Sequence, residues 1–307
     1  MTRAVCIGEC MVELRGAGEG LFGLGYAGDA YNTAVYLKRS APEAEVALLT
    51  ATGEGSMSAG MRAAWAEQGI SDRLAFTLPG TEPGLYMIEL DAAGDRTFHY
   101  WRSASPARQW LRRLVQAGGA EALAGADLVF LSGLSVAILD PADRIEAAQL
   151  IAALRGKVGL IAFDTNIRPA LWGGVAEAAR AALIPMIAAA DIVRASRDDA
   201  AWLFGATDPA EQAAALHGAG ARELALTLDA QGCALSNGGE LVCLPAPPTQ
   251  VRDTSGAGDS FNGGYLAARL AGAAPAQAAE AGLAVASRVV TWPGAIAPAH
   301  VSHPRRP

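Results

Sequence analysis

Residues 251–268 read VRDTSGAGDSFNGGYLAA and place Asp259 between a Gly-Ala-Gly run and an apolar stripe. Phe261 and Tyr265 are four residues apart, so the stripe predicts a helix with one face toward a core. Glycines at the start of such a helix expose amide N–H groups, which attract phosphate oxygens together with the helix dipole. The stretch therefore predicts an anion site at the beginning of a helix.

Two interpretations of Asp259 remain open from these residues alone. In the first, the carboxylate stabilises the first helical turn as a cap, which is worth about 0.5–2 kcal/mol. In the second, it takes a proton from a hydroxyl group while the Gly256–Gly258 amides stabilise a transferring phosphoryl group. The second interpretation accounts for both the glycines and the acid, and we favour it.

The composition indicates a folded, reduced protein. The 307-residue chain is 51% hydrophobic and 18% charged, and its net charge of −7 offers no basic surface for nucleic acid or an anionic membrane. Its four cysteines are too few for a disulfide framework and lack histidines at zinc-ligand spacing. The N-terminus turns acidic at Glu9, before any signal-peptide core. We therefore expect a cytoplasmic protein without a membrane partner.

The lysines exclude two classes of ATP-dependent enzyme. The chain has only Lys38 and Lys157, and neither follows a glycine-rich loop with Ser or Thr after it. A Walker-type NTPase needs such a lysine to reach the terminal phosphates. Protein kinases need a strand lysine together with HRD and DFG patterns, and the sequence contains neither pattern.

Short apolar runs alternate with helical segments along most of the chain. The strand-like runs are AVCIGECMVEL, EVALLTATG, ADLVFLSGL, GLIAFDTN, ADIVRAS and ELALTL. Helices are expected at 59–68, 142–154 and 175–190, the last interrupted by Pro185. This alternation predicts an α/β fold, with a doubly wound, mostly parallel central sheet and a ligand site at the carboxyl ends of its strands. A hairpin that turns at 237–239 should extend the sheet edge.

Two segments interrupt this alternation. Residues 84–102 predict two strands joined by a tight turn at 92–95. The segment around 15–28 contains Gly18, Gly20 and Gly23, which match the GxGxxG dinucleotide motif. No amphipathic helix follows that motif, so we reject a dinucleotide site and interpret the glycines as a flexible turn. We expect one domain over residues 1–307, with a small β lid formed by residues 12–28 and 84–102.

The motif DTSGAGDSFNGG resembles the signature D-T-x-G-A-G-D of the ribokinase-like (PfkB-type) carbohydrate kinases. In the N-terminal half, GECMVEL and YAGDAYNTAVYL resemble the first sugar-binding segment of that family. HYWRSASPAR and DTNIRP resemble the 2-keto-3-deoxygluconate kinases within it. The resemblance runs from about Val5 to Gly294, nearly the whole chain.

This resemblance implies a ribokinase-like fold and an ATP-dependent kinase that phosphorylates the terminal hydroxyl of 2-keto-3-deoxygluconate. It implies that Asp259 is the catalytic base and that Gly256, Ala257 and Gly258 bind the phosphoryl group. The implied substrate contacts are Gly28, Asp29, Asn32, Tyr86, Tyr100, Arg102, Arg168 and Asp259. The implied ATP contacts are Asn166, Arg168, Ser196, Thr227, Asp229, Gly232, Gly256, Ala257 and Gly258.

The resemblance also implies metal ions and partners. Magnesium (Mg2+) would bridge the nucleotide phosphates, with Asp199 reached through water, and potassium (K+) would lie near Asp253. The chain departs from the family pattern at SRDD, residues 196–199, where N-x-x-E is frequent. It departs again at TLDAQG, residues 227–232, where Asp229 replaces a glycine. The expected partners are a sugar acid, ATP and a second copy of the chain that pairs through the lid.

The residues give part of this assignment independent support. Tyr100 and Arg102 are two residues apart, so on a strand they share one face, whereas His99 should face away. A guanidinium binds a carboxylate bidentately, and a sugar acid carries the carboxylate that a hexose lacks. Other interpretations stay open: Arg102 as a solvated hairpin charge, Arg168 as a carbonyl cap, and both tyrosines as lid packing.

Several functions compete with the leading one. Within the family, the alternatives are a kinase of the galactonate-derived sugar acid, a fructokinase, a ribokinase or a nucleoside kinase. The arginines in YWR and NIR disfavour those that act on uncharged sugars. Outside enzymes, the alternative is a non-catalytic sugar-acid binding protein. The intact Gly-Ala-Gly-Asp run disfavours it, because a binding protein needs no base.

Overall fold

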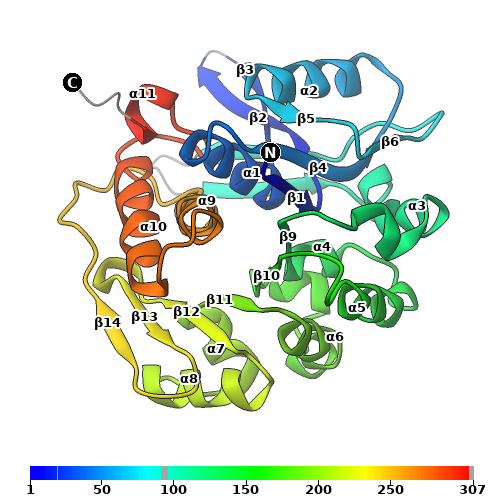
Figure 1. Ribbon diagram of the computed structural model, residues 1–307. Coiled ribbons are helices and arrows are strands. Elements are labelled where there is room, and N and C mark those ends of the chain that lie inside the picture. Colours follow the sequence, from blue (N-terminus) through cyan, green and yellow to red (C-terminus); the bar gives the residue numbers. More distant parts are fainter. Residues whose placement is uncertain (19, 91–95, 304–307) are drawn as a thin grey trace.

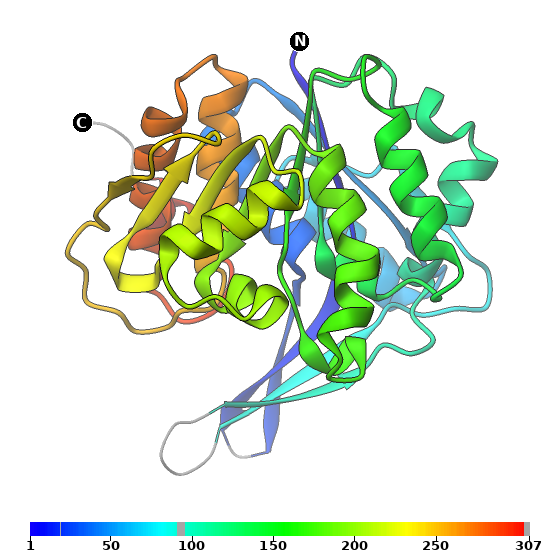
Figure 2. The same ribbon diagram turned by 90° about the horizontal axis from the view of Figure 1, so that it is seen from below.

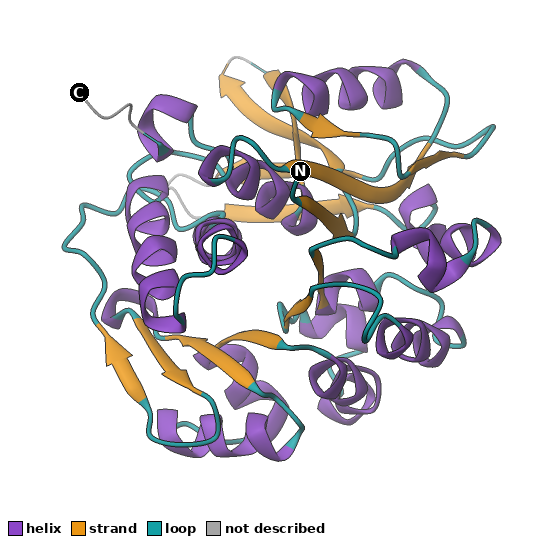
Figure 3. Cartoon of the chain, in the orientation of Figure 1, coloured by secondary structure: helices purple, strands orange, loops and turns teal. Residues whose placement is uncertain are grey.

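The computed structural model describes residues 1–18, 20–90 and 96–303. These residues form a ten-stranded main sheet, a separate four-stranded sheet, and helices on both faces of the main sheet (Figures 1 and 3). The order of the main sheet is β14-β13-β12-β11-β10-β9-β1-β4-β5, and β6 pairs with β4. The predicted α/β fold with a doubly wound sheet is confirmed.

The main sheet is parallel except at one edge. β1 pairs in parallel with β4 and β9, and the parallel pairing continues through β10, β11 and β12. β13 and β14 run antiparallel at the edge, as expected for the hairpin at 237–239. The strands are β1 (Arg3–Ile7), β4 (Glu45–Thr52), β5 (Ile70–Ser71), β6 (Ala75–Thr77), β9 (Leu128–Ser132), β10 (Leu160–Asp164), β11 (Ile192–Ser196), β12 (Glu223–Thr227), β13 (Cys233–Ser236) and β14 (Val242–Leu244).

The two faces of the sheet bury two hydrophobic cores. Along β1, Val5 and Ile7 pack into one core while Ala4 and Cys6 pack into the other, because alternate side chains of a strand point to opposite faces. The first core includes residues of α3 (Trp110–Gln116), α4 (Gly133–Ala137), α5 (Asp143–Ala153), α6 (Ala176–Ala189), α7 (Arg197–Phe204) and α8 (Pro209–Gly218). The second includes residues of α1 (Asp29–Ser40), α2 (Ser56–Glu67), α9 (Ala257–Leu270) and α10 (Pro275–Val289), and α11 (Ala299–Ser302) contacts α10.

One predicted interruption is wrong. Pro185 lies inside α6, which continues as a single helix from Ala176 to Ala189. Its ring faces solvent, while Leu183, Met186 and Ile187 on the same helix are fully buried. Packing of these neighbours outweighs the loss of one backbone hydrogen bond at the proline.

The four-stranded sheet is formed by the two segments that interrupt the alternation. Its order is β3-β2-β7-β8, with β2 (Met11–Gly18), β3 (Leu21–Ala27), β7 (Leu85–Leu90) and β8 (Arg96–Trp101). We call it the small sheet, and Figure 2 shows its strands projecting from the main body. The glycines of the GxGxxG match lie in a β hairpin rather than before a helix, which supports rejecting a dinucleotide site. The turn expected at 92–95 lies outside the described residues.

The described helices give no sign of a membrane-spanning segment. Across residues 1–18, 20–90 and 96–303, none combines the length and apolar character that a span requires.

α9 and α1 pack closely enough to require a glycine at their contact. A Cβ on Gly263 of α9 would overlap the Cβ of Tyr36 and would lie 2.7 Å from the backbone nitrogen of Leu37. Both obstacles belong to α1, and one of them is backbone, so the helices would have to separate. The contact matters for function because both helices begin at the same edge of the main sheet.

We expect Gly263→Ala to lower the free energy of unfolding by about 1–3 kcal/mol, the usual cost of overpacking a core. The matched control is Gly218→Ala in α8, where a new Cβ meets no atom within 4 Å. There the better helix propensity of alanine should leave stability unchanged or raise it by up to about 1 kcal/mol. Urea denaturation of both variants checks this, and equal responses would contradict the close-packing account.

Candidate active site

The start of α9 is an open turn that requires glycine. Gly256 precedes the helix with a backbone φ of 72°. A Cβ at this position would overlap the carbonyl oxygen of Ala295, so only glycine fits. Among the side chains that the structure describes, none caps α9. The amide groups of its first turn lack partners within the helix and can donate hydrogen bonds to an anion, although the Ala257 nitrogen also donates to the Thr254 carbonyl oxygen at 3.2 Å.

Asp259 lies in the first turn of α9 and is partly buried. Its carboxylate accepts a 2.8 Å hydrogen bond from Nδ2 of Asn32 on α1. Burial and, next, the charge of Asp29 raise the pKa of Asp259 to about 7, against the opposing influence of Asn32 and Arg168. This geometry favours the proton acceptor over the helix cap, because the carboxylate bonds another helix and not its own.

Asp29 and Asn166, expected at the sugar and at ATP, contact each other. Asp29 lies in the first turn of α1 and accepts hydrogen bonds from Ser132 Oγ and, at 2.7 Å, from Asn166 Nδ2. The carboxyl ends of β9 and β10 bring these donors to the place where α1 begins. Their side chains therefore join the start of α1 to the loop after β10.

Two charged residues of the neighbouring strands β10 and β11 were absent from the predicted site. Asp164, the last residue of β10, is 1% exposed and accepts hydrogen bonds from Arg194 Nη1 at 3.0 Å and Asn262 Nδ2 at 2.7 Å. Arg194 in β11 also donates from Nη2 to Thr227 Oγ1 at 2.9 Å. A signal was present in the sequence, because an arginine inside the apolar strand ADIVRAS requires a buried partner.

The other residues expected at ATP lie on turns after β11 and β12. Ser196 caps α7 by accepting a 3.0 Å hydrogen bond from the backbone nitrogen of Asp199. Asp229 has a φ of 53° and Gly232 a φ of 103°. A positive φ is uncommon for aspartate. The turn therefore keeps the left-handed conformation at the position where the family pattern has glycine.

The two acids expected near metal ions accept hydrogen bonds from the protein itself. Asp199 accepts from Thr165 Oγ1 at 2.7 Å and from the Ile167 backbone nitrogen at 3.1 Å, and burial raises its pKa. Asp253 accepts from the backbone nitrogens of Ser255, at 2.8 Å, and Gly294. In the part of the chain that the structure describes, no three His, Cys, Asp or Glu side chains form a metal-binding group.

The predicted tyrosines lie side by side in the small sheet. Tyr86 and Tyr100 pair across β7 and β8, with ring centroids 5.9 Å apart. Tyr86 is buried and its hydroxyl donates to Glu13, whereas Tyr100 is 50% exposed. Tyr100 is thus the more accessible of the two. His99 alternates with Tyr100 and bonds Glu89 at 2.8 Å, as expected of a structural residue on the other face.

Arg102 has a buried partner that the sequence interpretation missed. It forms an ion pair with Glu9, and the two side chains are 12% and 2% exposed. Burial raises the pKa of Glu9, and the Arg102 charge opposes that shift. The pair joins the end of the small sheet to the loop after β1, so the solvated interpretation of Arg102 is wrong.

Arg168 and Gly28 complete the predicted set. Arg168 is exposed, donates to the Ile167 carbonyl oxygen at 2.9 Å, and favours the charged form of Asp259. Gly28 precedes α1, and its backbone nitrogen donates weakly to Asn32 Oδ1 at 3.4 Å. The structure thus gathers the helix starts, the strand ends and the end of the small sheet around one edge.

Comparisons with known proteins identify the family of the chain. A model of the pfkB family carbohydrate kinases matches residues 1–301. The 2-dehydro-3-deoxygluconokinase of Dickeya dadantii is 41% identical over 95% of this chain and 96% of its own length. That of Escherichia coli K12 is 39% identical with the same coverage. Both relatives span nearly the whole chain.

Solved structures share the fold. The PfkB protein from Polaromonas sp. JS666 has a TM-score of 0.81 at 24% identity and covers 94% of this chain and 96% of its own. Aminoimidazole riboside kinase from Salmonella enterica also has a TM-score of 0.81, at 20% identity, over 96% of this chain and 95% of its own. At such identities the likeness concerns the fold alone.

We expect Arg102→Leu to lower the free energy of unfolding by about 3–5 kcal/mol at pH 8, because the Glu9 carboxylate loses its buried counter-charge. Adding Glu9→Gln should restore part of that stability by removing the unpaired charge. Urea denaturation of the wild type, both single variants and the double variant gives the coupling energy. A double variant no more stable than Arg102→Leu would contradict the ion-pair account.

Proposed function

Because the chain belongs to the pfkB family of carbohydrate kinases, we propose that it is an ATP-dependent 2-dehydro-3-deoxygluconokinase. This enzyme transfers a phosphoryl group to the terminal hydroxyl of 2-dehydro-3-deoxygluconate, which is 2-keto-3-deoxygluconate. The observation that carries the proposal is the Asp259 carboxylate, held by Asn32 beside the open first turn of α9. Full-length similarity to curated kinases of this sugar acid supports the choice of substrate.

The reaction follows from the position of Asp259. Its carboxylate accepts the proton of the sugar hydroxyl as the hydroxyl oxygen bonds to the γ-phosphorus of ATP. The bond from that phosphorus to the oxygen bridging to the β-phosphate breaks, and ADP leaves with the bonding electrons. The first-turn amides of α9, from Gly256 to Gly258, stabilise the charge on the transferring group. A base with a pKa near 7 is half ionised at neutral pH and suits this proton transfer.

Recognition of the sugar acid involves the small sheet. In the proposal, the Arg102 guanidinium binds the carboxylate of the sugar, and the exposed ring of Tyr100 covers the sugar from the same face. Arg168 binds either that carboxylate or a phosphate from the other side. Gly28 and Asn32 at the start of α1 offer hydrogen bonds to hydroxyl groups. The small sheet would thus act as the lid.

The nucleotide site lies along the turns after β11 and β12. The chemistry of the start of α9 fits the terminal phosphates of ATP, because no described side chain caps the amide groups of its first turn. Thr227, Asp229 and Gly232 would border the rest of the nucleotide. Mg2+ would neutralise phosphate charge during transfer. Since Asp199 is engaged by protein donors, we propose that it reaches the ion only through water.

We also propose K+ near Asp253, where loops 253–256 and 290–295 are tied together. A second copy of the chain would pair through the small sheet. Its edge strand β3 exposes Leu21, Phe22 and Leu24, which are 66%, 51% and 48% accessible. A cytoplasmic location would suit the free thiols of all four cysteines.

Asp259→Asn should lower kcat by about 10²–10⁴, because the hydroxyl loses its proton acceptor. A coupled assay of ADP release with 2-keto-3-deoxygluconate measures this loss. The control is Asp208→Asn, since Asp208 caps α8 and accepts hydrogen bonds from the Ala210 and Glu211 nitrogens. The control should keep wild-type kcat. A folded Asp259→Asn enzyme with near wild-type kcat would remove Asp259 from the mechanism.

Arg102→Leu should reduce kcat/KM for the keto-deoxy sugar acid about tenfold more than for an uncharged hexose, which corresponds to ~1.4 kcal/mol. Both sugars offer hydroxyl groups to the start of α1, but only the acid offers a partner for the guanidinium. Measuring both substrates on both proteins separates recognition from general damage to the small sheet. A parallel fall for the two sugars would assign Arg102 to scaffolding.

A further inference from the structure

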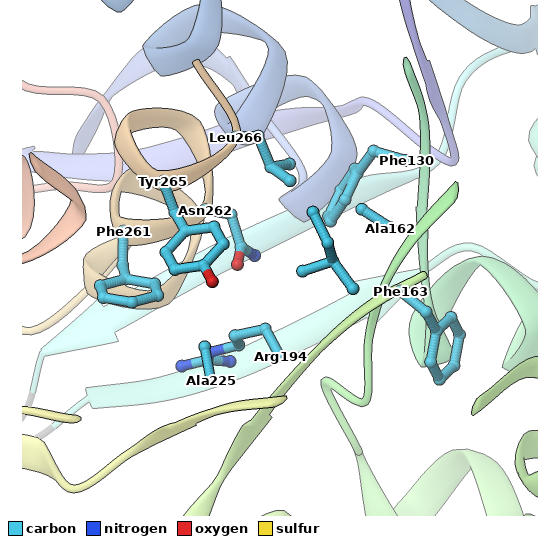
Figure 4. A pocket seen from close by; sticks show the side chains of 10 residues that line it. Phe130, Ala162, Phe163, Arg194, Ala225, Phe261, Asn262, Tyr265 and Leu266 are labelled. Carbon is cyan, nitrogen blue, oxygen red and sulfur yellow. The ribbon is translucent and has the colours of Figure 1, made fainter. Parts of the chain in front are cut away.

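The guanidinium of Arg194 packs against the first turn of α9 at Gly258. A Cβ built on Gly258 would lie 2.9 Å from Arg194 Nη2, and its three nearest neighbours are all atoms of this guanidinium. Glycine at 258 thus lets the first turn of α9 rest on the guanidinium. Figure 4 shows Arg194 extending from its strand toward α9, near Asn262 and Tyr265.

The guanidinium is fixed in this place. Nη1 donates to Asp164 at 3.0 Å and Nη2 to Thr227 Oγ1 at 2.9 Å. The cavity beside it measures only about 10 Å³ and is lined by apolar side chains together with Asn262 and Tyr265. A space of that size is too small for a ligand, and it leaves the Arg194 side chain no room for another rotamer. A charge held this way needs no reorganisation when an anion arrives.

The surrounding carboxylates make this charge necessary. Asp29, Asp164 and Asp259 repel one another, since the first two raise the pKa of the third. Burial disfavours the charge of Arg194, but Asp164 and then Asp199 and Asp259 raise its pKa. A polyphosphate that approaches the start of α9 therefore meets a strongly acidic neighbourhood. Backbone amides alone would have to overcome that repulsion.

We infer that Arg194 is the positioning residue that makes the start of α9 attractive to the phosphates of the nucleotide. The inference rests on the proposed kinase function and extends it to a residue outside the GAGD motif. The positive charge of Arg194 raises the electrostatic potential at the Gly256–Gly258 turn. Its hydrogen bonds are made to Asp164 and Thr227 and not to the nucleotide. It therefore offsets the acidic cluster at the point where the phosphoryl group is transferred.

A purely structural role makes a different prediction. If Arg194 only neutralised Asp164, its loss would lower stability without changing the preference for a charged nucleotide. The inference instead predicts that ATP binding falls about tenfold or more relative to adenosine binding, since adenosine carries no phosphate. The ratio of the two dissociation constants is thus the discriminating quantity.

The test measures ATP and adenosine binding by calorimetry for the wild type, Arg194→Gln and Arg194→Lys. In Arg194→Gln the preference for ATP over adenosine should fall at least tenfold. Arg194→Lys should retain most of that preference, because the positive charge remains beside Asp164. The matched control is Arg269→Gln. Arg269 lies near the end of α9 and pairs with Glu223 at 2.8 Å, so its loss should lower stability but leave the ratio of the two dissociation constants unchanged.

Should Arg194→Gln not fold, the double variant Arg194→Gln with Asp164→Asn leaves no unpaired buried charge. The ratio should change in the same direction, because the lost guanidinium is nearer to Gly258 than Asp164 is. An unchanged ratio in a folded variant, with an active wild type, would overturn the role of Arg194. If the wild type phosphorylates no sugar but Arg194→Gln still shows the expected loss of preference for ATP over adenosine, the proposed function is overturned and Arg194 remains an anion-site residue.

Discussion

Several carboxylates buried at one edge of a sheet must each find hydrogen bonds or counter-charges. Asp164 has Arg194 and Asn262, Asp29 has Ser132 and Asn166, and Asp199 has Thr165 and a backbone amide. Asp259 differs, because within the described residues it accepts from one donor, Asn32 Nδ2, whereas each of the other three accepts from at least two. The carboxylate with the weakest support is thus the one whose pKa rises to about 7. The network that stabilises its neighbours leaves Asp259 able to exchange a proton near neutral pH.

The fold places these groups together by joining distant parts of the chain. Parallel pairing from β9 to β12 aligns the carboxyl ends that carry Ser132, Asp164 and Thr227, and it places Arg194 of β11 opposite Asp164. The close contact of α1 and α9 at Gly263 brings Asn32 to Asp259. The Glu9–Arg102 pair then holds the small sheet near the same edge. Stability and chemistry therefore depend on the same few contacts.

The fold and the central motif were largely predictable, because they rest on local patterns. Continuous apolar runs indicated buried parallel strands, and the Gly-Ala-Gly-Asp run before an apolar stripe indicated the start of α9. The GxGxxG match was correctly set aside, since strand β3 and not a helix follows the turn. The interruption predicted at Pro185 was wrong, because burial of the neighbouring side chains keeps α6 intact. That burial is not visible in the sequence alone.

Long-range partners were less predictable. Glu9 and Arg102 are far apart in sequence, as are Asp29 and Asn166, and periodicity does not report such pairs. Arg194 carried a signal, a charge within an apolar strand, but its position beneath Gly258 depends on how α9 packs on the sheet. The hydrogen bonds that join residues such as Asp29 and Asn166 or Asn32 and Asp259 therefore emerge only in three dimensions.

The most direct measurement of the central claim is the initial rate of ADP release across a panel of sugars. The panel contains 2-keto-3-deoxygluconate, its galactonate-derived epimer, fructose, ribose and a nucleoside, each with ATP and Mg2+. The account predicts the highest kcat/KM for 2-keto-3-deoxygluconate and much lower values for the uncharged sugars. Preference for ribose or fructose would contradict the sugar-acid assignment, and no turnover with any member would contradict the kinase itself.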